Sequence, residues 1–165
     1  MIISIKEREL AIIVCGEMCY AVDTTGKIYD EMSLEEEENH NLQELPVLQD
    51  GANKNFQLQE TILAPAYIQY INDAREKLSS DLEIEIEREL FTPQLISGDI
   101  RAKTKEGWSI YLDKSISLEK EMAMLRVVLK NKIEKEKRPD LEYIDLRTDN
   151  KVYYKYKTSS VIQEE

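Results

Sequence analysis

One short stretch limits the folds that this chain can adopt. Residues 81–90 are rich in glutamate, which is typical of a helix, but Leu82, Ile84 and Ile86 are separated by single glutamates. A repeat of two residues is the repeat of a β-strand, whose successive side chains point to opposite faces. The pattern therefore predicts a strand with one buried and one solvated face.

Further strands are expected on both sides of this stretch. β-Branched residues are dense in residues 2–14, and short turns then separate residues 19–23 and 27–29 into a meander. The later segments with a strand pattern are residues 100–105, 108–112, 141–147 and 151–157.

Two segments repeat their apolar residues every three or four positions, which predicts helices. The first covers residues 61–78 and has Pro65 in its first turn, and the second covers residues 117–132 with Ser117 as its N-cap. The order of the elements predicts an α+β fold: a mostly antiparallel, twisted β-sheet with two helices packed on it.

Charge and hydropathy narrow the class of protein. The chain has 33 acidic and 22 basic residues among 165, a net charge of −11, which repels nucleic acids and anionic membrane surfaces. No stretch approaches the roughly 20 apolar residues that span a bilayer, and no signal peptide is recognised. Either the chain stays in the compartment where it is made, or it is a part of a longer membrane protein.

The residues that would carry chemistry are sparse. The only histidine, His40, lies in an acidic segment, and the five glycines form no phosphate-binding loop. We therefore expect no catalytic residues, no cofactor and no metal site. The acidic run lacks the central glycine of a calcium loop and is interpreted as a solvated loop; it consists of Glu35, Glu36, Glu37 and Glu38.

The two cysteines, Cys15 and Cys19, leave two interpretations open. They are either two small buried thiols or, if they face each other across a tight hairpin, a disulfide. A disulfide would imply an oxidising compartment.

The last strand pattern in the chain, residues 151–157, is the segment most typical of a binding surface. A terminal strand often lies at a sheet edge, where its backbone groups can pair with another chain. Tyrosines offer large rigid contact areas with a polar tip, and lysines protect an edge against aggregation. Packing of the same tyrosines in the core is the alternative interpretation.

Several segments together resemble one protein family. They are "ISIKERELAIIV" (residues 3–14), "YAVDTTGKIYDE" (20–31), "LPVL" (45–48) and "YIDLRTDNKVYYKYK" (143–157). In this order and spacing they resemble the extracytoplasmic β domain of the FtsQ/DivIB family of bacterial division proteins, over nearly the whole chain. The resemblance implies that residues 1–7 are the last strand of a truncated POTRA domain, residues 8–157 the β domain and residues 158–165 a polar tail.

The resemblance also implies a function. Members of the family are membrane-anchored, have no catalytic activity and organise the division machinery by binding the coiled-coil proteins FtsB and FtsL, whose strand adds to the last strand of the domain. The chain would then act at the extracytoplasmic face of the cell membrane, at the division site. Carried over by position, the partner-binding residues are Arg147, Lys151, Val152, Tyr153, Tyr154, Lys155 and Tyr156.

Two points stay open on the sequence alone. The alternation puts Val152, Tyr154 and Tyr156 on one face of the last strand and Tyr153 and Lys155 on the other, without assigning the face that meets the partner. The alternative function is that of a soluble acidic interaction or inhibitor protein unrelated to division.

Overall fold

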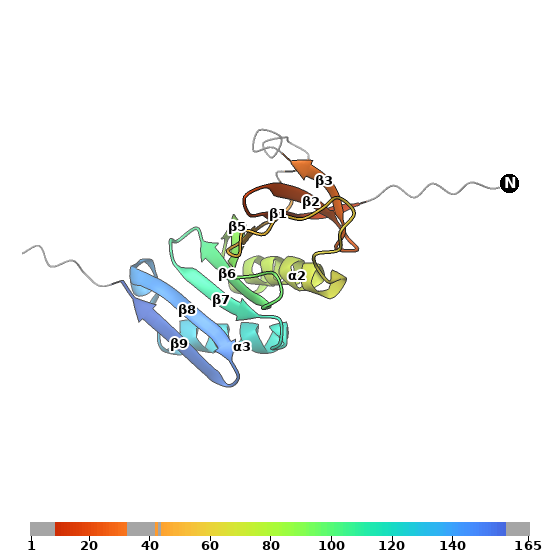
Figure 1. Cartoon of the computed structure of the whole chain (residues 1–165). Coiled ribbons are helices and arrows are strands. Elements are labelled where there is room, and N and C mark those ends of the chain that lie inside the picture. Colours follow the sequence, from red (N-terminus) through yellow and green to blue (C-terminus); the bar gives the residue numbers. More distant parts are fainter. Residues whose placement is uncertain (1–8, 33–41, 43, 158–165) are drawn as a thin grey trace, which may run out of the picture.

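The computed structural model describes residues 9–32, 42 and 44–157, and in this part of the chain nine strands form one sheet (Figure 1). The order across the sheet is β3-β2-β1-β4-β5-β6-β7-β8-β9. The strands are β1 (Leu10–Cys15), β2 (Cys19–Asp23), β3 (Ile28–Met32), β4 (Val47–Asp50), β5 (Ile86–Thr92), β6 (Asp99–Thr104), β7 (Ser109–Asp113), β8 (Leu141–Thr148) and β9 (Lys151–Tyr156). The helices are α2 (Pro65–Leu82), α3 (Leu118–Asn131) and the 3₁₀ helix η1 (Lys135–Asp140).

The predicted fold class is wrong in both the sheet and the helices. The sheet is mixed rather than mostly antiparallel, because β1 pairs parallel with β4, β4 with β5, and β7 with β8. Between β4 and β5 the chain passes through α2, and between β7 and β8 it passes through α3 and η1. A chain that crosses over through a helix enters the next position in the same direction, which gives parallel strands. The third helix, η1, is not in the prediction at all.

The alternating stretch at residues 81–90 is a strand only in its second half. Helix α2 runs on to Leu82, and Glu83 ends it with a φ of 56° while its amide donates to the carbonyl of Ser79. Ile84 is buried, and β5 begins at Ile86. Leu82 lies four residues after Leu78, so it also continues the apolar face of the helix, and this tertiary packing overrides the local alternation.

Several other predicted elements are confirmed with small shifts at their ends. Strand β2 has the predicted bounds, and Ser117 is the N-cap of α3, with its Oγ accepting a hydrogen bond from the Lys120 amide at 3.3 Å. The acidic run Glu35–Glu38, His40, and the predicted POTRA strand and polar tail lie outside the described residues.

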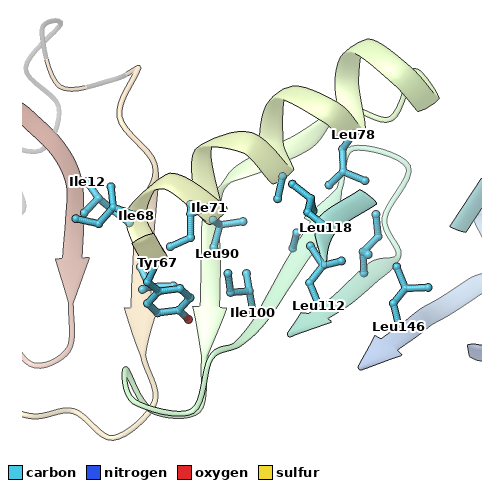
Figure 2. Packing of buried hydrophobic residues seen from close by; sticks show 14 of the residues in the cluster. Ile12, Tyr67, Ile68, Ile71, Leu78, Leu90, Ile100, Leu112, Leu118 and Leu146 are labelled. Atoms are coloured by element: carbon cyan, nitrogen blue, oxygen red, sulfur yellow. The ribbon is translucent and has the colours of Figure 1, made fainter. Parts of the chain in front are cut away.

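Both long helices pack on one face of the sheet and form the main core with it. Tyr67, Ile68 and Ile71 of α2 lie on the side of the helix that faces the strands (Figure 2). Trp108 and Ile110 of the β6–β7 hairpin are fully buried in the same cluster. Burying these side chains is the main contribution to the stability of the fold.

The opposite face of the sheet differs between its two halves. On β1, β2 and β4 it is buried as well, in a second cluster that contains Ile13, Ala21 and Val47. On β6, β7 and β8 buried residues alternate with partly exposed ones, so this half has one face packed against the helices and one face open. We call the second of these the open face.

Candidate functional site

The last strand, β9, lies at the edge of the sheet. Within the described residues, its one paired neighbour is β8, which it joins in an antiparallel hairpin. Asn150 has a φ of 59° in the turn, a conformation that asparagine tolerates better than most residues. The carboxylate of Asp149 forms an ion pair with Lys120, which ties this turn to α3.

The backbone of β9 offers hydrogen-bonding groups on its outer side. The Lys157 amide donates to the carbonyl of Asp140 at 2.8 Å, toward β8. Because N–H and C=O groups alternate in direction along a strand, Lys155 and Tyr153 also point their backbone groups toward β8. The N–H and C=O groups of Val152, Tyr154 and Tyr156 therefore point away from the sheet, and we call these three residues the outer set.

The side chains of the outer set lie on the helix side of the sheet. Val152 and Tyr156 pack against the main core, whereas the Tyr154 side chain is 41% exposed. The rings of Tyr154 and Tyr156 meet edge to face, with their centroids 5.9 Å apart. Of the two tyrosines on this face, Tyr156 thus contributes to the core, and Tyr154 is available for contact with a partner.

A shallow apolar groove runs between β9 and α3, beside Val152 of the outer set. Its volume is about 370 Å³. Val127 of α3 lines it with 56% of its surface exposed. The residues that line the groove are Ala123, Met124, Val127, Val128, Asn150 and Val152. We call it the α3–β9 groove.

The other side of β9 belongs to the open face and is basic. Lys151, Tyr153 and Lys155 alternate with the outer set, and Tyr153 is 52% exposed. The Nζ of Lys155 lies 2.7 Å from a carboxylate oxygen of Glu142, whose hydrogen bond and charge raise the pKa of the lysine. The Nζ of Lys157 donates to the carbonyl of Pro139 at 2.9 Å. Lys151 and Lys155 thus place two ammonium groups on this side of β9, and that of Lys157 is held at η1, just past the end of the strand.

Arg147 lies on the open face and is occupied by acidic residues of the chain itself. Its Nε and Nη2 donate to the two carboxylate oxygens of Asp145 at 2.9 and 2.6 Å, and its Nη1 donates to Asp99 at 2.5 Å. Burial alone would raise the pKa of Asp145, but the hydrogen bonds and charge of Arg147 outweigh it and lower this pKa. A partner carboxylate at Arg147 would have to displace these bonds, so the role that the resemblance implies for this residue stays a prediction.

The guanidinium of Arg147 also belongs to a stack of rings and cations across the open face. Its Cζ lies 4.9 Å from the ring centroid of Tyr111, and the Cζ of Arg101 lies at the same distance from that ring. Arg101 also lies over the ring of Phe91, and Tyr143 stacks on Tyr111 at 5.0 Å. Such contacts fix the side chains of β5 to β8 in place.

The cysteines lie in a different part of the molecule from β9. Cys15 ends β1, Cys19 begins β2, and the two residues face each other in the register of this pair. The structure joins them by a disulfide, and both residues are buried. Strands β1 and β2 are separated from β9 by the middle of the sheet, so the disulfide takes no direct part in the β9 edge.

One buried acid, Glu121, connects α3 with α2 and the sheet. Its carboxylate accepts hydrogen bonds from the Tyr70 hydroxyl and, at 2.9 Å, from the Asp113 amide. Burial raises the pKa of Glu121 to about 7, although both hydrogen bonds act to lower it. Its contacts are to groups of two other elements, α2 and β7, and they hold α3 against the sheet next to the groove.

The part of the chain that the structure describes holds no group of metal ligands and no helix suited to crossing a bilayer. No three side chains of His, Cys, Asp or Glu in it are grouped so that they could hold a metal ion. None of its helices combines the length and the apolar character that a bilayer crossing requires. No family model matches the chain, and a search of curated proteins found no match to it.

Sequence reasoning missed the α3–β9 groove, although its signal is present. The buried face of α3 is formed by Leu118, Met122 and Leu125, and Ala123 and Val127 fall outside it. An apolar arc wider than one buried face indicates a second contact surface on a helix.

Proposed function

We propose that this chain is a non-catalytic binding module whose β9 edge accepts an extended segment of a partner protein as an additional strand. The observation that carries the proposal is the position of β9 at the rim of the sheet, with the backbone groups of Val152, Tyr154 and Tyr156 directed outward. An incoming strand would extend the hydrogen-bond ladder there, which is a common mode of peptide recognition.

The resemblance to the FtsQ/DivIB family suggests the cellular process and the partner. We propose that the chain is a scaffold of the bacterial division machinery and that its partners are coiled-coil proteins of the FtsB and FtsL type. Two features support it: the last strand is tyrosine-rich and lies at a sheet edge, and an apolar groove accompanies this edge.

A proline scan of β9 tests the strand addition. Because the Tyr154 amide points outward, Tyr154→Pro removes a donor for the guest strand and leaves the ladder to β8 intact. We expect it to weaken binding of a peptide from an FtsB-type protein at least about tenfold, the equivalent of one hydrogen bond. Binding is measured by isothermal titration calorimetry, and folding by circular dichroism.

Two matched variants control this experiment. Tyr154→Phe keeps both the amide and the ring and is expected to bind like the wild type. Lys155→Pro removes an amide that points toward β8 and is expected to destabilise the β8–β9 hairpin, by about 3 kcal/mol. Amide hydrogen exchange gives a direct readout, because the peptide should protect the amides of the outer set. A folded Tyr154→Pro variant that binds with unchanged affinity would refute strand addition at β9.

A further inference from the structure

The two sides of the β9 edge differ in chemistry, and a guest strand would meet both. On the helix side, its side chains would meet the α3–β9 groove, which Val127 lines, and, farther along β9, the exposed ring of Tyr154. On the open face, they would lie beside Lys151, Tyr153 and Lys155. Since the side chains of a strand alternate between its two faces, each side of β9 would contact every second residue of the guest.

We infer that the β9 edge selects an extended partner segment in which apolar and acidic residues alternate, the apolar ones seated in the α3–β9 groove and the acidic ones facing the lysines. This inference rests on the proposed function and adds the chemistry of the partner to it. The apolar positions bury the exposed flank of α3, and the acidic positions pair with the ammonium groups of the open face.

The charge of this rim stands out against the rest of the molecule. The whole chain carries a net charge of −11, but the open-face side of β9 presents Lys151 and Lys155. Within the described residues Lys155 pairs with Glu142, and Lys157, just past the end of β9, donates to the carbonyl of Pro139. An acidic protein repels acidic partners at long range, so the lysines act at contact distance and determine which residues fit at alternate positions.

The same lysines disfavour a second copy of this chain as the occupant. If two β9 strands paired antiparallel in one continuous sheet, their open faces would lie on the same side. Lys151 and Lys155 of one copy would then approach the lysines of the other, and like charges on neighbouring strands are destabilising. A partner with acidic residues at these positions removes the conflict.

Three synthetic peptides of equal length test the inference on the intact chain. In the first, valine alternates with glutamate; in the second, valine alternates with lysine; in the third, serine alternates with glutamate. We expect the first to bind at least about tenfold more tightly than either of the others at low salt, since both sides of the edge are then matched. Fluorescence anisotropy gives the affinities, and hydrogen exchange reports on the outer set.

Variants of the chain assign the preference to each side. Lys151→Glu is expected to reduce the advantage of the valine–glutamate peptide over the valine–lysine peptide, while Lys54→Glu, an equal change at an exposed loop residue, leaves it unchanged. Val127→Asp is expected to weaken both valine peptides, while Ile96→Asp, at another exposed apolar residue, does not.

The outcomes separate the inference from the proposed function. Equal binding of the three peptides, with the amides of Val152, Tyr154 and Tyr156 protected in each, would overturn the selectivity and leave strand addition standing. Protection of none of these amides by any peptide, together with failure of the FtsB-type peptide, would overturn both. Concentration-dependent self-association that protects the same amides would identify a second copy as the occupant and overturn the inference.

Discussion

The two edge strands of the nine-stranded sheet differ in whether other parts of the chain bond to their outer backbone groups. At β3, the chain itself supplies the next hydrogen bonds: the Ile28 amide donates to the carbonyl of Glu60, and the Gln59 amide donates to the carbonyl of Ile28. At β9, the backbone groups of the outer set have no such cover within the described residues. The β3 edge, which we call the closed edge, is thus covered at its first residue by a loop of the same chain, and the β9 edge is left for a guest.

The two edge strands also differ in charge: β3 is acidic and β9 is basic. The exposed residues of β3 include Asp30 and Glu31, whereas the open-face side of β9 carries lysines. An edge that is closed by its own chain needs no lysines against aggregation, whereas an open edge does. This difference favours β9 over β3 as the site where a further strand would add, and it can be tested at both edges.

The largest effect is expected where the closed edge is anchored. Gly26 has a φ of 82°, and a Cβ there would lie 1.8 Å from the carbonyl oxygen of Leu63. Ile62 and Leu63 both donate their amides to the carbonyl of Gly26, so this contact holds the covering loop in place. Gly26→Ala should lower the free energy of unfolding by about 4 kcal/mol, since backbone must move.

Gly107→Ala is the matched control for this variant. Gly107 has a similar φ of 91°, but the nearest atom to an added Cβ is the Lys157 Nζ, at 3.9 Å. It should cost only about 1 kcal/mol, the strain of a left-handed alanine. Urea unfolding of both variants measures the two changes. Equal decreases in the free energy of unfolding would show that the close approach to Leu63 does not contribute to the effect.

A pH-dependent effect is expected at the helix that borders the open edge. The pKa of Glu121 is about 7 in the folded chain against an ordinary value of 4.5. The ionised form is therefore disfavoured by folding, so stability falls as pH rises from about 4.5 through 7, by up to about 3 kcal/mol. Glu121→Gln removes this charge and should gain stability relative to the wild type as pH increases.

Unfolding titrations of both proteins between pH 5 and pH 8 measure this effect. Subtracting the two curves removes the contributions of all other titrating groups. A difference between wild type and Glu121→Gln that stays constant with pH would contradict a raised pKa of this carboxyl group.

A smaller effect is expected at the turn that leads into β3. The Oδ1 of the buried Asp23 accepts hydrogen bonds from the Thr25 amide at 2.8 Å and from the Lys27 amide at 3.1 Å. Asp23→Ala should lower the free energy of unfolding by about 2 kcal/mol, because these donors lose their acceptor. Asp30→Ala, on an exposed side chain of the closed edge, should change it by less than about 0.5 kcal/mol. Thermal unfolding compares them, and similar losses in both would contradict the anchoring role of Asp23.

Much of the local structure could be predicted because it depends on near neighbours in the chain. Strand β2, the helical face of α2 and the capping of α3 by Ser117 follow from spacing and side-chain chemistry over a few residues. The stretch at residues 81–90 shows the limit, because Leu82 satisfies both the strand pattern and the helix pattern. Packing of α2 on the sheet decides between them.

The candidate site, too, has features that depend on near neighbours in the chain and features that depend on distant ones. The tyrosines and lysines of β9, and its place as the last strand pattern, can be read directly from the sequence. Three further features depend on the folded chain: the three parallel strand pairs, the bond from Arg147 to Asp99, 48 residues away, and the position of α3 beside β9. The physical reason is range: periodicity records which face of an element is buried, whereas strand direction and ion pairing depend on where distant segments meet in space.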